Sequence, residues 1–328
     1  MAFSGTVGQT TFDTRKVIEH AMRLCRVPAQ QITPEHIQIA TEQLGFMLLS
    51  WANDNVPLWC IDKVVLPLYE GVPGVPLPAG SVDVLNANFR TMTEATGTST
   101  SAATTYQTAL TTAAQATTLG VQWSGDAVPI ALEHSSDGVT WTTIQTENPS
   151  ASDGEWTWFD LDSGITAAYF RVRATSGALA VSRLYIGTSP SEIPLARMNR
   201  DDWTSFPNKF QSSNRPLQYW LDRQARIPVM NMWPVPNADA ATSMLVVWRH
   251  RHIMDVGTMR QEVEVPMRWY DALVYSLAAR IVMEVPEADV SRQPTLDGMA
   301  GRALYAARNE ERDNSPVRIA PNISMYTA

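Results

Sequence analysis

Residues 88–187 constrain the fold most, because their composition and periodicity differ from the rest of the chain. The stretch contains no lysine and no cysteine. Short runs of apolar and β-branched residues recur in it, separated by turn signals of Ser, Asp and Gly. The strand candidates are Thr118–Ser124, Ile130–Ser135, Trp141–Gln145, Trp156–Leu161, Tyr169–Ala174 and Ala180–Ile186. Regular short strands with polar turns predict an all-β sandwich, which we expect to be one inserted domain.

The sequence on both sides of this insert predicts helices. Residues 13–26 and 34–52 carry apolar residues at helical spacing and are separated by a short loop. Asp13 or Thr14 can cap the first helix, and Thr33 can cap the second. Two further helices are expected at residues 266–284 and 295–312. Each has one apolar face, so we expect the four helices to pack as a bundle.

Strands are also expected outside the insert. Ile227–Trp233 alternates apolar and polar residues and is stopped by Pro234-Val-Pro236, and the apolar run Ser243–Trp248 follows after a short polar loop. This order predicts a β-hairpin. Trp59–Leu66 and Ser81–Leu85 are further strand candidates, and the proline-rich residues between them predict a loop, because proline donates no ladder hydrogen bond.

The expected fold class is therefore α+β: a four-helix core with a β-hairpin or small sheet, plus an inserted all-β sandwich. The expected divisions are residues 1–87 for the first part of the core, 88–187 for the insert, 188–313 for the second part and 314–328 for a C-terminal arm. The arm contains two prolines and scattered apolar residues, which cannot form a core alone. It is either a frayed tail or a segment that orders on a partner.

Charge and cysteine content exclude some classes of protein. The formal net charge is −8 at pH 7, which argues against a protein that grips nucleic acid by neutralising phosphates. A non-basic channel wall is nevertheless compatible with DNA that slides past. We expect no membrane span and no secretory signal. Cys25 and Cys60 are too few and too far apart for a disulfide framework, so we expect buried thiols in a protein made in a reducing cytoplasm.

No motif in the sequence predicts catalysis, a cofactor or a metal site. A serine-centred elbow, a P-loop and a dinucleotide fingerprint are all missing from the sequence. His250 and His252 would face one side of a strand, but no further ligands have suitable spacing. Glu133, Asp160 and Asp162 could be imagined as a glycosidase pair, although the sequence gives no separation between them. We expect a protein that is not an enzyme.

Aromatic residues of the insert give two alternatives. Trp156 and Trp158 share a face of one strand and would form either a glycan-stacking platform or part of the sandwich core. The order Val-Gln-Trp, Glu-His-Ser-Ser-Asp-Gly-Val-Thr-Trp, Trp-Phe-Asp-Leu, Tyr-Phe-Arg-Val-Arg and Arg-Leu-Tyr-Ile-Gly resembles discoidin-like and carbohydrate-binding sandwiches of the jelly-roll type. This resemblance implies a fold more than a ligand.

A mixed cluster of arginines, carboxylates and aromatic residues surrounds residues 200–226. Basic residues in this chain are skewed to arginine, since lysine occurs only at Lys16, Lys63 and Lys209. Arginine and tryptophan are typical of energetically important contacts between proteins. The cluster is either a subunit–subunit contact or an intramolecular network that braces a long loop. The candidate interface residues are Arg200, Asp201, Asp202, Trp203, Arg215, Tyr219, Trp220, Arg223 and Arg226.

The order of residues in this region resembles one family. The segments Arg-Asp-Asp-Trp, Pro-Leu-Gln-Tyr-Trp, Arg-Gln and Trp-Pro-Val-Pro, with the N-terminal helical region and the helix near 266–284, resemble the head-to-tail adaptor (connector) proteins of short-tailed bacteriophages, also called tail tubular protein A-like or packaged-DNA stabilisation proteins. Residues 88–187 lie outside the resemblance. It implies a virion structural protein at the head–tail junction, in a twelve-fold ring below the portal that continues the DNA channel.

The resemblance also implies partners. They are the portal protein, tail tube, nozzle or tail-fibre proteins, and genomic DNA that passes without sequence-specific binding; no membrane is involved. In the C-terminal arm, the candidate portal contacts are Val317, Arg318, Ile319, Ile323 and Tyr326. The alternative is a virion protein that binds glycan or host surface through the sandwich. An enzyme acting on cell-wall sugars is the weakest reading.

Overall fold

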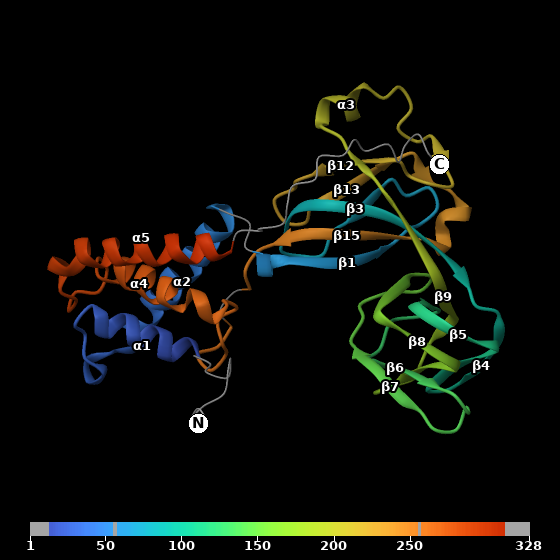
Figure 1. Ribbon diagram of the computed structural model, residues 1–328, viewed down its shortest axis with the longest axis horizontal. Coiled ribbons are helices and arrows are strands. Elements are labelled where there is room, and N and C mark those ends of the chain that lie inside the picture. The colour runs from blue at the N-terminus through green and yellow to red at the C-terminus, as the bar shows by residue number, and fades with distance from the viewer. Residues whose placement is uncertain (1–12, 55–57, 255–256, 312–328) are drawn as a thin grey trace, which may run out of the picture. The chain divides into compact units, whose positions relative to one another are not determined.

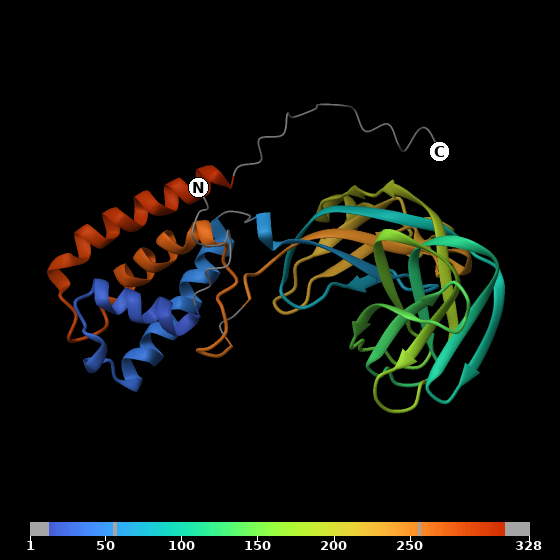
Figure 2. The ribbon, with the colours of Figure 1, turned by 60° about the horizontal axis from the view of Figure 1, so that its bottom comes forward.

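The structure is a computed structural model that describes residues 13–54, 58–254 and 257–311. The described residues divide into two compact units. We call the part up to Asp62 together with the part from His250 onward the helical unit, and Lys63–Arg249 the strand unit. Figures 1 and 2 show helices in the first and mostly strands in the second.

All four predicted helices are present in the helical unit. They are α1 (Thr14–Leu24), α2 (Pro34–Asp54), α4 (Tyr270–Ile281) and α5 (Gln293–Glu310). Short 3₁₀ turns cover Ala29–Gln31, Leu58–Cys60, Met267–Trp269 and Val290–Arg292. The third helix is shorter than predicted, because residues 267–269 form a 3₁₀ turn before α4 begins.

Capping residues set the starts of the first two helices. Asp13 Oδ1 accepts a hydrogen bond from the Lys16 amide at 2.8 Å, and Thr33 Oγ1 accepts one from the His36 amide at 3.3 Å. The four helices enclose one apolar core to which both ends of the chain contribute. At its centre the Trp269 ring lies 5.3 Å from that of Trp51, measured between centroids. Burial of such rings is a main source of the unit's stability.

One nine-stranded sheet dominates the strand unit. Its order is β1-β15-β3-β9-β5-β8-β6-β7, with β4 paired to β5. The strands are β1 (Ile61–Pro67), β3 (Ser81–Glu94), β4 (Gly97–Ala102), β5 (Thr105–Trp123), β6 (Ile130–Ser135), β7 (Thr142–Glu147), β8 (Trp156–Ala174), β9 (Val181–Pro194) and β15 (Met244–Arg251).

Smaller elements flank this sheet. A four-stranded sheet has the order β10 (Ala196–Arg197), β12 (Gln218–Asp222), β13 (Val229–Trp233) and β2 (Gly74–Pro76). A two-stranded sheet pairs β11 (Ser212–Ser213) with β14 (Val235–Pro236). The short helix α3 covers Arg200–Ser205, and a 3₁₀ turn covers Ala238–Thr242.

The sandwich arises because β5 and β8 are long and bend over the same core. The first part of β5 pairs with the second part of β8, and Thr118–Gln122 pairs with Trp156–Asp160, with register shifts between. Side chains from both parts, including Leu119 and Phe170, share one apolar cluster with β6 and β9. The structure thus contains an antiparallel, sandwich-like β region, and it joins two predicted short strands into the single strand β8.

Strand β15 is buried on both faces, which explains its uninterrupted apolar sequence. Leu245 and Val247 belong to a core with β12 and β13. Met244 and Val246 point to the opposite face, where they pack with Trp156, Trp158 and Tyr185 of the sandwich-like region. We call this second group the junction core. Because side chains alternate along a strand, one strand supplies two cores.

The hairpin prediction for this part of the chain is wrong, and the expected domain boundaries do not coincide with the ends of strands. The hairpin of Ile227–Trp233 with Ser243–Trp248 does not form, since β13 pairs with β12 and β2, whereas β15 lies in the large sheet. Pro234, Pro236 and the 3₁₀ turn after them redirect the chain. The expected boundaries at 87/88 and 187/188 fall inside β3 and β9, which continue through both parts (Figure 1).

Candidate functional site: the surface around helix α3

Helix α3 contains the first residues of the predicted interface cluster, and a capping side chain stabilises its N-terminus. The Asn199 side-chain oxygen accepts a hydrogen bond from the Asp202 amide at 2.8 Å and caps the helix. Asp201 and Asp202 lie in the first turn, where negative charge is favourable. Sequence reasoning missed this helix, although Asn followed by acidic residues is the ordinary start signal.

A row of aromatic rings fixes the α3 segment to β12 and β13. Trp203 is 9% exposed, and its ring centroid lies 5.8 Å from that of Trp220. Phe206 lies 4.3 Å from Trp233 in a stacked arrangement. Tyr219 is 2% exposed and belongs to the core beneath. Trp203 and Tyr219 therefore pack within the chain, which leaves little of either side chain exposed to another subunit.

Two arginines of this region are also engaged internally. Arg223 Nη2 lies 2.6 Å from Asp83 Oδ2, and Arg197 Nη2 lies 2.9 Å from Asp83 Oδ1. One carboxylate thus ties the start of the small sheet to the segment after β12. For Arg223 the alternative of an intramolecular brace fits the geometry.

Other arginines of the cluster remain available to a partner. Within the described part of the chain, Arg200, Arg215 and Arg226 make no hydrogen bond or ion pair, and Arg200 and Arg226 are exposed. Phe210, which follows α3, is 75% exposed, and Ile227, which follows Arg226, is 43% exposed. Unpaired guanidinium groups together with exposed apolar side chains are typical of contact surfaces between proteins. For brevity we call these five residues the α3 surface, although Arg226 and Ile227 lie in the turn between β12 and β13, at the other end of β12 from Arg215.

The two tryptophans considered as a glycan platform are buried. Trp156 is 8% and Trp158 is 7% exposed, and their rings stack with centroids 5.0 Å apart. Both lie in the junction core instead of the sandwich core. They therefore offer no exposed platform, and packing accounts for most of their surface. Parts of both rings still line a pocket of about 370 Å³.

The carboxylates considered for hydrolysis are neutralised by arginine and lysine. Glu133 lies 2.6 Å from Arg171 and 2.9 Å from Arg173. Burial alone would raise the pKa of Glu133, but the two guanidinium groups outweigh it and hold this pKa below its usual range. Asp160 lies 2.6 Å from Lys63 and 3.0 Å from Arg90, and its pKa is lowered in the same way. The side chain of Asp162 is outside the described part.

These pairs are structural in character. Asp160 belongs to β8 and Lys63 to β1, so their ion pair links strands at distant positions in the sheet. A glycosidase needs one carboxyl group that stays protonated as the general acid, and the lowered pKa values of Glu133 and Asp160 do not suit either residue to that role.

The two histidines lie at the end of strand β15. His250 is 3% exposed in β15, and His252 follows the end of this strand. Among the described residues, no group of three or more His, Cys, Asp and Glu side chains could hold a metal ion.

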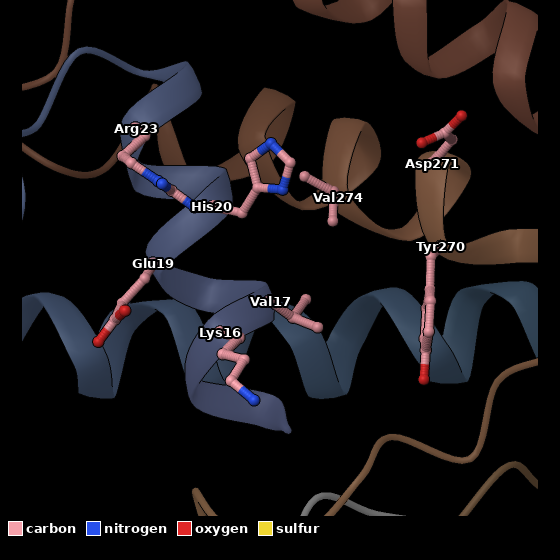
Figure 3. A pocket seen from close by; sticks show the side chains of 8 residues that line it. All are labelled: Lys16, Val17, Glu19, His20, Arg23, Tyr270, Asp271 and Val274. Carbon is pink, nitrogen blue, oxygen red and sulfur yellow. The ribbon is translucent and has the colours of Figure 1, made fainter. Parts of the chain in front are cut away.

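The helical unit contains a hollow of about 210 Å³ between α1 and α4. Figure 3 shows the His20 ring beside Val274, with Lys16 and Glu19 directed elsewhere. Glu19 pairs with Arg15 at 2.7 Å, and Lys16 lies 3.6 Å from Asp13. The volume of this hollow is below the range of about 300–1,000 Å³ for small-molecule sites, so we assign the hollow no ligand.

The predicted portal contacts Val317, Arg318, Ile319, Ile323 and Tyr326 lie outside the described residues. Of the helices in the described part, none has the length and apolar character needed to cross a membrane.

Comparisons with known proteins give a likeness to carbohydrate-binding modules among solved structures. CBM32-1 from a family 31 glycoside hydrolase of Clostridium perfringens is 17% identical, covers 41% of this chain and 98% of its own, and has a TM-score of 0.24. The CBM32 of AlyQ in complex with 4,5-unsaturated mannuronic acid is 11% identical, with coverages of 33% and 98% and a TM-score of 0.24.

A third such structure, CpGH89CBM32-6 produced by Clostridium perfringens, is 21% identical over 26% of this chain and 68% of its own, with a TM-score of 0.23. These scores are too low to establish a shared fold, so the architecture rests on the strand pairing described above. No protein-family model matches the sequence, and no curated protein is similar to it.

Proposed function

We propose that this protein is a virion structural protein of a short-tailed bacteriophage, the adaptor ring between portal and tail. The observation that carries the proposal is the α3 surface, where Arg200, Arg215 and Arg226 have no partner within the described chain and Phe210 and Ile227 are exposed. Such a surface gains free energy when another chain covers it. The order of residues around this surface resembles that of the adaptor family, and for this reason we propose the adaptor ring as the assembly.

The proposed mechanism is assembly without chemistry. Rings use head-to-tail contacts, in which one face of a subunit meets a different face of the next. The α3 surface supplies one face of each contact. In this proposal the bundle of α1, α2, α4 and α5 docks on the portal, and the strands continue the channel toward the tail.

Electron microscopy of negatively stained particles tests this function. The purified protein is imaged alone and after mixing with the portal protein of the same phage. We expect closed rings that stack on the portal, with about twelve copies, the number that the resemblance to the adaptor family implies. A protein that stays monomeric in both samples, with a portal that stays bare, contradicts the proposal.

A second function, recognition of a glycan, is favoured by a different observation. The pocket of about 370 Å³ beside Trp156 and Trp158 combines aromatic walls with polar groups. A glycan array probed with the full chain tests it. Saturable binding to one class of glycan supports this function, and its absence across the array contradicts it.

A further inference from the structure

The pocket beside Trp156 and Trp158 lies at the meeting of two parts of the strand unit. One wall comes from the segment that joins β1 to β2, including Tyr69 and Val72, and the other from the start of β8 and the residues before it. Its volume of about 370 Å³ is at the small end of the range for ligand sites. It is therefore suited to a small ligand or a terminal group and not to a folded partner.

Trp158, which lines the pocket, has an indole N–H with no acceptor in the described part of the chain. Trp158 is 7% exposed, and its Nε1 makes no hydrogen bond within the described part of the chain. The benzo part of this indole lies over Gly120, because a Cβ built there would lie 2.6 Å from Cε3. The Nε1 atom is on the opposite edge of the ring. A buried N–H without a partner costs free energy. The Nε1 atom itself exposes less than 1 Å² of surface, so the contact that Trp158 offers a ligand is the apolar part of its ring.

The polar groups that line the pocket include those of Tyr69 and Glu155. The Tyr69 hydroxyl accepts a hydrogen bond from the Trp156 amide at 3.0 Å, which leaves its own proton free to donate. Burial raises the pKa of Tyr69 above its ordinary value, so the hydroxyl keeps that proton at neutral pH. Glu155 is exposed and lines the pocket; its Oε2 accepts from the Ser152 amide at 2.7 Å, and Oε1 is left to accept from a ligand.

The ligand class follows from this pattern. The walls are apolar and aromatic, with Val65, Pro76 and the two indoles, and the Tyr69 hydroxyl and the Glu155 carboxylate add a donor and an acceptor to the lining. A pyranose ring has apolar C–H faces and hydroxyls around its edge, each able to donate and accept. We propose that this pocket binds one uncharged hexopyranose unit at the end of a surface glycan. The proposal rests on the second function, glycan recognition.

Saturation-transfer difference NMR on the full-length protein tests the site. The probes are methyl glycosides of glucose, galactose and N-acetylglucosamine, each at about 10 mM, because single-sugar affinities are near the millimolar range of weak binding. Ser150 is exposed and lines the pocket, so Ser150→Trp would fill it without altering the core. We expect this variant to lose the saturation transfer that the unmodified protein gives.

A conservative pair of variants sharpens the test. Glu155→Gln retains an oxygen for the Ser152 amide and should weaken binding about fivefold through loss of a charge-assisted hydrogen bond. Glu147→Gln makes the same change on the exposed strand β7, outside the pocket, and should leave affinity unchanged. In ¹H–¹⁵N spectra, the indole signal of Trp158, assigned by its loss in Trp158→Phe, should shift when the sugar is added.

The possible outcomes distinguish a failure of the assigned pocket from a failure of the proposed glycan recognition. Binding that is lost in Ser150→Trp and weakened in Glu155→Gln supports the pocket. Binding that is equal in the unmodified protein and both variants overturns the pocket but leaves glycan recognition standing. No binding to any probe, together with a blank glycan array, overturns both.

Discussion

The Trp158 indole lies over Gly120, so closely that a Cβ built on Gly120 would stand 2.6 Å from its Cε3 atom. This contact joins neighbouring strands β8 and β5 and holds Trp158 in the junction core. Because interiors are close-packed, even one added methyl group must displace the ring or the backbone.

We therefore expect Gly120→Ala to destabilise the protein by about 1–3 kcal/mol, as overpacking does. Urea denaturation followed by circular dichroism measures the change. Gly298, in the exposed part of α5 with no atom near its Cβ position, gives the matched control. Gly298→Ala should stabilise the protein by about 0.5–1 kcal/mol through helix propensity. Equal effects of both substitutions would contradict the packing argument.

The insert is not expected to fold by itself. A fragment of residues 88–187 would cut β3 and β9 and would expose Trp156, Trp158 and Tyr185, which pack on Met244 and Val246 in the intact chain. We expect such a fragment to show poorly dispersed amide signals in NMR spectra. Extending it to Lys63–Arg249 restores the junction core and should restore dispersion. A well-dispersed spectrum from the short fragment would refute this expectation.

Removing one arginine of the α3 surface should affect assembly and not folding. Arg226 is exposed and has no partner in the described chain, so Arg226→Ala should leave the melting temperature unchanged while weakening self-association about tenfold. Sedimentation velocity measures the association. Arg260 is also exposed and also unpaired among the described residues, and Arg260→Ala serves as the control. A lower melting temperature without an assembly defect would favour an internal role for Arg226.

The buried Glu133 should make the stability depend on pH. Its two arginine partners lower its pKa in the folded state, so the charged form stabilises the fold above the unfolded pKa, and this contribution is lost as pH falls through the folded pKa. We expect Glu133→Gln to cost about 3 kcal/mol at pH 7, because Arg171 and Arg173 lose their partner. Below pH 4 the difference from the unmodified protein should shrink. A pH-independent difference in unfolding free energy would argue against this origin.

Both thiols should be unreactive in the folded protein. Burial raises the pKa of Cys25 and of Cys60 to about 11, and both side chains are fully buried. Relative to an ordinary thiol, this reduces the thiolate fraction at pH 8 by roughly 100-fold. We expect mass spectrometry to find no alkylation by iodoacetamide in the native state and two modified sites after denaturation. Rapid labelling of either cysteine in the native protein would show that the helical core opens.

The helices were predictable because local signals define them. Asp13 and Thr33 are caps that act within three residues, and the apolar stripe of α2 repeats along a single element. The apolar run of β15 also identified a strand. Its partner was not predictable, since the choice between β13 and the large sheet depends on two cores that only the folded chain brings together.

The candidate site could be predicted only in part, because its contacts also depend on residues that are far apart in sequence. Sequence identifies which residues are arginine or tryptophan, but not which of them already have partners. Asp83 lies far from Arg223 along the chain, yet the Asp83 carboxylate pairs with the Arg223 guanidinium and neutralises its charge. The pocket beside Trp158 was missed because its two walls, residues 65–76 and 150–158, are far apart in sequence.

The continuity of β3 and β9 has a mechanical consequence. Asn88–Glu94 pairs with Gly187–Pro194 where the sandwich-like region begins. A flexible tether would let this region swing, whereas two hydrogen-bonded strands behave as a stiff stem. A force on the far end of the sandwich-like region would therefore bend the sheet that contains β15. The strain would be transmitted to the part of the subunit that forms the channel in the proposed ring, because the paired strands leave no hinge to absorb it.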